Sequence, residues 1–194
     1  MSMIGSRQQA QQGHEQLIAH PDFNAPWCQT LLSDRHIQWP AKTKDDILQE
    51  SGHNSLFEQT LYHPTGIRAH LAFRRPTTEP DSIHRLEDYF LLSLGTGLDG
   101  KTGRAHGGLS GVICDHISGH AAVKIDPKGE PPATATMTMG YLRPIETPCV
   151  VLARAWVCEV SGRKVWVKAV VEDGEGRVLV RSKCLFVLAR RDKI

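Results

Sequence analysis

The sequence predicts an α+β fold in which an antiparallel β-sheet wraps around one central helix. The C-terminal part of the chain holds three strand patterns in a row, and residues 107–121 carry the one strong helical pattern. An antiparallel meander with one solvated face needs an apolar cover on its other face. A sheet curled around that single helix supplies this cover most economically.

The predicted strands are identified by β-branched and apolar residues that recur at every second position. In residues 133–141, Thr134, Thr136 and Thr138 alternate with small or apolar residues, so the threonines are expected to share one face. Turn residues at 161–162 and 173–176 separate the last strands. The other expected strands cover residues 67–73, 88–94, 151–157, 164–172 and 178–186.

The chain is expected to divide into three parts. Residues 1–12 are polar and lack the apolar core of a secretory signal, so they are interpreted as a disordered leader. Residues 13–65 are expected to form a partly helical N-terminal extension, helical near 45–49, that packs on the core. Residues 66–194 form the domain with the sheet and the helix. The extension would make its contacts through Leu31, Leu32, Trp39, Leu48, Leu56 and Phe57.

Composition excludes several classes of function. The 194 residues are 40% hydrophobic and 23% charged, as in ordinary globular proteins. A net charge of +2 is too small to indicate nucleic acid, and no apolar run approaches the roughly 18–20 residues that span a bilayer. The five cysteines lack CxxC spacing and are expected to be buried, reduced thiols. An intracellular, cytoplasmic protein is expected, and the acid-poor N-terminus is also compatible with a mitochondrial location.

On a helical wheel, residues 107–121 present two different faces. One face is apolar, and the other carries Asp115 as its only acidic side chain, beside Gly108, Gly111, Ser118 and Gly119. A glycine costs a helix about 1 kcal/mol relative to alanine, so several on one face indicate that something approaches closely. The apolar face comprises Leu109, Val112, Ile113, His116, Ile117 and His120.

The start of this helix has the features of a site that polarises a carbonyl group. His106, Gly107 and Gly108 precede and open the helix, whose first N–H groups have no partner within it. The glycines would let a carbonyl reach these donors, and the helix dipole favours developing negative charge. Asp115 lies about 10–12 Å further along the axis at 1.5 Å per residue. Either the substrate binds elsewhere, or the two groups come from different subunits of a two-fold dimer.

Three motifs, in this order, resemble those of the hot-dog-fold thioesterase superfamily, and most closely its PaaI-like acyl-CoA thioesterase branch. They are HGG-x6-D at 106–115, Tyr-x-Arg-Pro at 141–144 and Gly-Arg-Lys at 162–164. The resemblance covers roughly residues 85 to 190. It implies a hot-dog fold and hydrolysis of an acyl thioester such as acyl-CoA, without metal or cofactor, by a homodimer or homotetramer.

The resemblance also implies roles for single residues. Gly107 would donate its N–H to the thioester oxygen, and Asp115 of the opposite subunit would act as general base or nucleophile. Thr134 matches a hydroxyl residue that positions the water. His106 is a candidate catalytic residue, and fixing the loop is its alternative role. The candidates for substrate binding are Gly108, Gly111, Arg143, Arg163 and Lys164.

Two other functions remain open at this point. One fold hosts several reactions, so a hot-dog dehydratase, hydratase or tailoring enzyme acting on a thioester or polyketide-like intermediate is an alternative. A non-catalytic acyl-binding protein is another, although it would be expected to lose Asp115. His116 and His120 have a spacing that suits a metal, but no third ligand is apparent and none is expected. Gly100 stands where some relatives carry Asn.

Overall fold

The computed structural model describes residues 18–40 and 54–190. Its main sheet is antiparallel, six-stranded and ordered β1-β2-β6-β7-β8-β5. These strands are β1 (Ile67–Pro76), β2 (Leu86–Leu94), β5 (Ala133–Tyr141), β6 (Cys149–Ser161), β7 (Lys164–Glu172) and β8 (Val178–Val187). The other elements are η1 (Pro21–Phe23), α2 (Pro26–Leu32), η2 (Leu56–Leu61), η3 (Thr96–Leu98), β3 (Asp99–Lys101), β4 (Arg104–Ala105), α4 (Gly107–Ala122) and η4 (Val123–Ile125).

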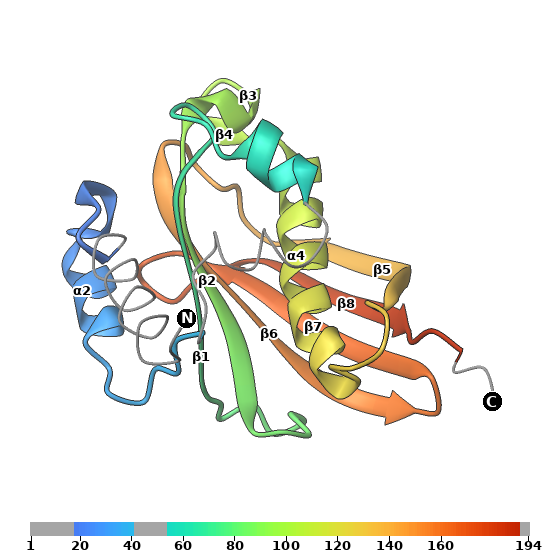
Figure 1. The fold of residues 1–194 in the computed structure, drawn as a ribbon. Coiled ribbons are helices and arrows are strands. Elements are labelled where there is room, and N and C mark those ends of the chain that lie inside the picture. The colour runs from blue at the N-terminus through green and yellow to red at the C-terminus, as the bar shows by residue number, and fades with distance from the viewer. Residues whose placement is uncertain (1–17, 41–53, 191–194) are drawn as a thin grey trace, which may run out of the picture.

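The helix α4 lies against one face of the curled sheet (Figure 1). Ile113 and Ile117 are fully buried between the helix and the strands. Opposite them, β6 supplies alanines and β7 supplies valines, and these small side chains let the helix lie close to the sheet. This arrangement confirms the predicted hot-dog fold, an antiparallel sheet wrapped around one central helix.

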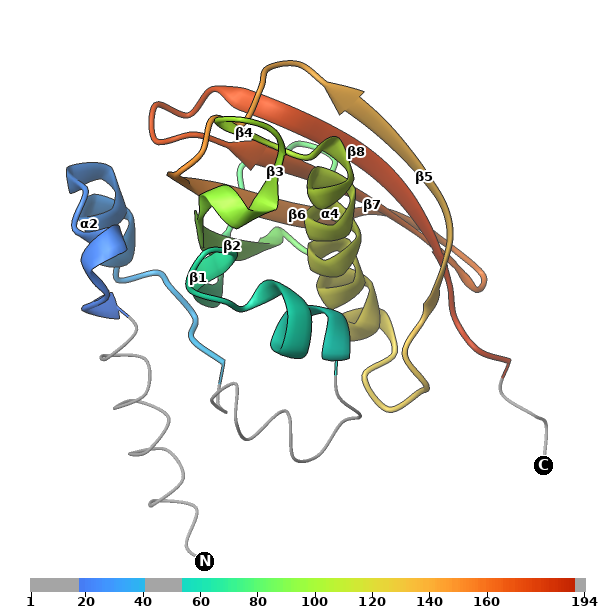
Figure 2. The ribbon, with the colours of Figure 1, turned by 90° about the horizontal axis from the view of Figure 1, so that it is seen from above.

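A second hydrophobic cluster lies on the opposite face of β1 and β2. Figure 2 shows α2 and α4 on opposite sides of these strands. Phe23 and Cys28 are fully buried there against Leu71 and Leu91. Leu31, Leu32 and Trp39 are partly buried and pack on this cluster.

Two other expectations for the N-terminal region have different outcomes. Leu56 is 46% exposed, so its predicted packing role is wrong, whereas Phe57 is buried in the cluster that surrounds α4. The leader at 1–12, the helix near 45–49 and Leu48 lie outside the described residues.

Within the described residues, no helix is long and apolar enough to cross a membrane.

The predicted division of α4 into an apolar face and a bare, glycine-rich face is wrong. Ser118 is fully buried on the supposedly bare side. A Cβ at Gly111 would lie 3.6 Å from Met137 of β5, and one at Gly119 would lie 3.7 Å from the ring of Phe186. The groups that approach these glycines closely are therefore strands of the same chain.

The threonines of β5 do not share one face, because the strand contains a β-bulge. Thr134 pairs with Phe186 and Thr136 pairs with the adjacent Leu185, so Ala135 is an extra residue. An extra residue changes the side on which every following side chain lies. Thr134 consequently faces α4 together with Met137, whereas the predicted alternation places these two on opposite faces.

Candidate active site

His106 fixes the start of α4. It is the N-cap residue, and its Nδ1 accepts a hydrogen bond from the Gly108 N–H at 2.9 Å. A Cβ at Gly108 would lie 2.9 Å from this nitrogen, and one at Gly100 would lie 2.8 Å from the ring carbon Cδ2. Both glycines are therefore needed to accommodate the imidazole. This contact gives a physical reason for the glycine at position 100, where some relatives carry Asn. The hydrogen bond to Gly108 indicates that His106 fixes the loop.

The N–H of Gly107 is the open donor at this helix terminus. The Gly108 N–H is bonded to the His106 ring, and the Leu109 N–H donates to the His106 carbonyl at 2.9 Å. For Gly107, no acceptor is recorded among the described residues. The N–H of Gly108 is thus occupied, and the predicted role of Gly108 in substrate binding stays a prediction. The carbonyl of Gly107 accepts a hydrogen bond from Tyr141 Oη at 3.2 Å.

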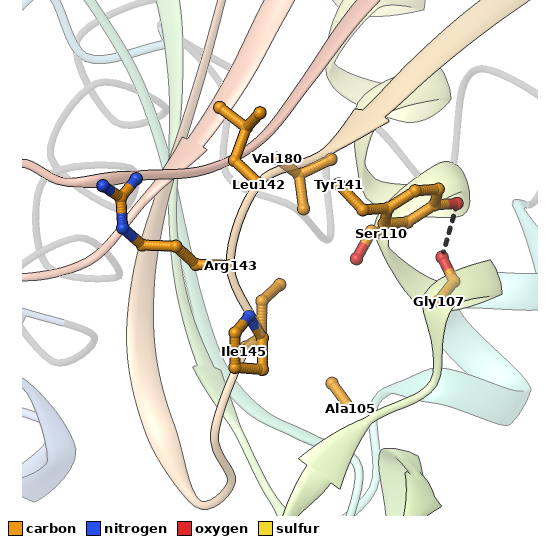
Figure 3. A pocket seen from close by; sticks show the side chains of 9 residues that line it. Ala105, Gly107, Ser110, Tyr141, Leu142, Arg143, Ile145 and Val180 are labelled. Carbon is orange, nitrogen blue, oxygen red and sulfur yellow. Dashed lines mark hydrogen bonds between the residues drawn. The ribbon is translucent and has the colours of Figure 1, made fainter.

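A pocket of about 280 Å³ opens beside Gly107 (Figure 3). Tyr141 and Leu142 are 58% and 47% exposed, so they form part of its accessible rim. Arg143 also lines the pocket, and its Nη1 donates to the carbonyl of Val178 at 2.9 Å. The lining comprises Ala105, Gly107, Ser110, Tyr141, Leu142, Arg143, Pro144, Ile145 and Val180.

Asp115 lies further along the helix and outside this pocket. Its Oδ1 accepts a hydrogen bond from the Thr134 hydroxyl at 2.8 Å, which joins α4 to the start of β5. Strand β5 runs back along α4, because its later residues contact the start of the helix. Asp115 follows Gly107 by eight positions, which is about 12 Å along the axis. The pocket of one chain therefore lacks that chain's own carboxylate.

Other candidate residues lie away from the pocket. Arg163 is in the turn between β6 and β7, and its Nη1 donates to the carbonyl of Leu188 at 2.9 Å. Lys164 pairs with Val187, which also pairs with Ala133, so both basic residues lie at the Thr134 end of the sheet. Gly111 contacts β5, as described above. The proposed roles of all three in substrate binding stay predictions.

Sequence reasoning missed two residues near the start of α4. Asp99 accepts the Gly103 N–H at 2.8 Å and the hydroxyl of Thr147, so it joins the β3–β4 turn to the loop before β6. The turn sequence Asp-Gly-Lys-Thr-Gly was a signal for this bond. Ser110 was the other omission, although its position three residues after Gly107 places it on the same side of the helix.

His116 and His120 are packed among aromatic rings. Their centroids are 4.9 Å apart, and Phe57 stacks on His116 at 4.1 Å. Burial lowers the pKa of His116 to about 4. In residues 18–40 and 54–190, no group of three or more His, Cys, Asp and Glu side chains is placed to hold a metal. All five cysteines are free thiols, and Cys28, Cys114 and Cys184 are buried.

One family model matches part of the chain. Residues 102–180 match the family model of the thioesterase superfamily. A thioesterase from Haemophilus influenzae is similar in structure, with 14% identity, a TM-score of 0.51, and coverage of 62% of this chain and 80% of its own. No curated protein matches the chain.

Two further solved structures give the same picture. A mutant of a hypothetical thioesterase from Streptococcus pneumoniae is 15% identical with a TM-score of 0.51, covering 64% of this chain and 93% of its own. Zebra fish thioesterase superfamily member 2 is 14% identical with a TM-score of 0.50, covering 60% of this chain and 81% of its own. At such low identities the likeness shows the fold.

Proposed function

We propose that this chain, whose residues 102–180 match the model of the thioesterase superfamily, is a member of that superfamily and hydrolyses an acyl thioester of the acyl-CoA type to a free acid and a thiol. The proposal includes membership of the PaaI-like branch and action as a homodimer or homotetramer. It also includes the division into leader, extension and domain given above. The observation that carries it is the open N–H of Gly107 at the start of α4, beside a pocket.

The chemistry at Gly107 follows from this geometry. A thioester oxygen that accepts the Gly107 N–H is polarised, so its carbon becomes more electrophilic. As water or a carboxylate attacks, negative charge grows on that oxygen at the positive end of the α4 dipole. A prepared donor of this kind typically contributes about 2.7–4 kcal/mol of transition-state stabilisation. His106 supports the donor by holding the first turn of the helix in place.

The second half of the site is the pair formed by Asp115 and Thr134. The hydroxyl of Thr134 orients the carboxylate, which then takes a proton from water or attacks the thioester carbon itself. The sulfur leaves with the electron pair of the broken C–S bond and is protonated to the thiol. After direct attack by the carboxylate, the acyl group is held on Asp115 as an anhydride, which a water molecule then cleaves to the free acid and the carboxylate. Asp115 of one chain cannot meet a carbonyl at Gly107 of the same chain, because about 12 Å of helix separates them.

Pairing of two β5 strands would bring the halves together. β5 is the last strand of the sheet and is largely exposed. In an antiparallel pair about a two-fold axis near Met137, the Thr134 end of one strand lies beside the Tyr141 end of the other. Since Thr134 contacts Asp115 and Tyr141 contacts Gly107, each carboxylate then lies near the partner's open donor.

The test is release of free thiol from a series of acyl-CoA esters. Asp115→Asn keeps the size of the side chain but cannot act as base or nucleophile, so turnover should fall by roughly 10²-fold or more. Asp126→Asn, at the next carboxylate after α4, is the matched control and should keep wild-type turnover. An Asp115→Asn variant that is folded by thermal melting and retains more than a tenth of wild-type activity would contradict the proposal.

A further inference from the structure

The pocket at the start of α4 contains a buried hydroxyl that no other described residue uses. Ser110 is 3% exposed, and its side chain points into the ring of lining residues (Figure 3). Its Oγ has no hydrogen-bond partner recorded among residues 18–40 and 54–190. The hydroxyl is therefore free to bond a polar atom that a ligand brings into the pocket.

The remaining polar groups of the pocket are occupied or directed elsewhere. The hydroxyl of Tyr141 donates to the Gly107 carbonyl. The guanidinium of Arg143 donates to the Val178 carbonyl and extends away from Ser110 (Figure 3). The rest of the lining is apolar and consists of Ala105, Leu142, Pro144, Ile145 and Val180. Apart from Tyr141 and Arg143, whose polar groups bond backbone carbonyls, Ser110 is the one side chain of this lining that can form a hydrogen bond.

We infer that Ser110 determines specificity by binding an oxygen atom on the acyl group of the substrate. The inference rests on the proposed function and adds a substrate class to it: acyl groups with a hydroxyl or keto oxygen a few atoms from the thioester. Ser110 follows Gly107 by three residues, on the same side of the helix and about 4.5 Å further along the axis. With the thioester oxygen at the Gly107 N–H, that spacing suits an oxygen on the third or fourth acyl carbon.

The apolar lining favours the acyl group over the thiol carrier as the occupant. The pantetheine arm of CoA carries two amide groups, whose donors and acceptors need several polar partners when they are buried. A lone hydroxyl cannot satisfy them. The volume of about 280 Å³ lies just below the usual range of pockets for drug-sized ligands, so it suits a small acyl group.

The experiment compares 3-hydroxyhexanoyl-CoA with hexanoyl-CoA and measures the ratio of their kcat/KM values. Ser110→Ala should lower this ratio by about two- to twelvefold, the range for one neutral hydrogen bond. Hexanoyl-CoA should be hydrolysed at least as fast as by the wild type. Ser110→Thr keeps a hydroxyl and should keep most of the preference. The matched control is Ser118→Ala, because Ser118 is a buried serine of the same helix that lies two turns further along α4 and outside the pocket.

Two results would overturn the inference. In one, Ser110→Ala lowers kcat/KM equally for both substrates, which would give the hydroxyl a structural role or a contact with the thiol arm. In the other, Ser118→Ala changes the ratio as much as Ser110→Ala does.

Binding measurements distinguish failure of this inference from failure of the proposed hydrolysis. Calorimetry with the same two esters and the Asp115→Asn variant, with and without Ser110→Ala, measures the preference without turnover. If wild-type protein releases no thiol, the hydrolysis proposal fails. The inference about Ser110 then survives only if the Asp115→Asn variant binds 3-hydroxyhexanoyl-CoA more tightly and loses this preference with Ser110→Ala.

Discussion

The separation of Gly107 from Asp115 along α4 predicts that two inactive variants restore activity to each other. A Cβ at Gly107 would lie 3.6 Å from the Tyr141 ring, an ordinary contact, so the backbone tolerates a side chain. The larger Gly107→Val side chain should fill the space in front of the N–H and exclude the carbonyl. Loss of this donor should cost about 2.7–4 kcal/mol, or roughly 10²–10³-fold in turnover.

Mixing Gly107→Val with Asp115→Asn separates the two halves of the site. In a mixed dimer with shared sites, one site has both parts intact and the other has neither. Statistical exchange makes about half of the dimers mixed, and each of them has one good site of two. Thiol release should therefore return to about a quarter of the wild-type rate. Native mass spectrometry with one variant mass-tagged measures the fraction of mixed dimers.

The absence of recovery, with mixed dimers confirmed by mass, would refute the shared site. Each chain would then combine its own Gly107 and Asp115, and every site in the mixture would be broken. Each variant subjected alone to the same exchange procedure is the control. A fully active monomer in sedimentation experiments would contradict the dimer model independently.

Three other outcomes follow from the structure. Thr134→Ala should lower kcat by roughly ten- to a hundredfold, the range for a hydrogen bond to a charged group, whereas Thr136→Ala on the other face of β5 should not. Burial lowers the pKa of His116 from 6.5 to about 4. Between pH 4 and pH 6.5 the unfolded state therefore binds more protons than the folded state. The free energy of unfolding should fall as the pH drops from 6.5 to 4. In urea titrations, His116→Phe should reduce this fall by up to about 1.4 kcal/mol per pH unit, and an unchanged slope would contradict the assignment. Dialysis against a strong chelator should leave thiol release unchanged, and a loss restored by one metal would contradict the expectation that no metal is needed.

The regular elements could be predicted because their patterns are periodic. The predicted strand 133–141 and the observed β5 have the same bounds, and the helix predicted over 107–121 ends one residue later in the structure. Apolar residues at a period of two or about three and a half are a local signal that burial reinforces. The contact between Thr134 and Asp115 agrees with the family resemblance, although the roles of these residues stay predictions.

The remaining features depend on which elements lie next to each other. The bulge at Ala135 is invisible in the sequence, since strict alternation continues through it and only pairing with β8 reveals the extra residue. The helical wheel placed Ser118 and Gly119 on an open face of α4. This prediction is wrong because β5 and β8 cover that face, although its small residues suggest that it is open. The role inferred for Ser110 could not be predicted from the sequence, because it depends on the apolar residues that the loop after β5 places around it.

The two outer edges of the sheet differ in a way that limits how the protein can assemble. At the β1 edge, the backbone of Gln38 exchanges hydrogen bonds with Arg74, at 2.8 and 3.0 Å. This segment blocks part of the edge against another strand. The β5 edge stays accessible, and a two-fold pair of β5 strands uses that edge of both chains. Pairing through β5 would thus close after two chains and could not propagate into a fibril. Deleting the segment around Gln38 would remove the stop at the other end and turn a self-terminating sheet into one that can grow.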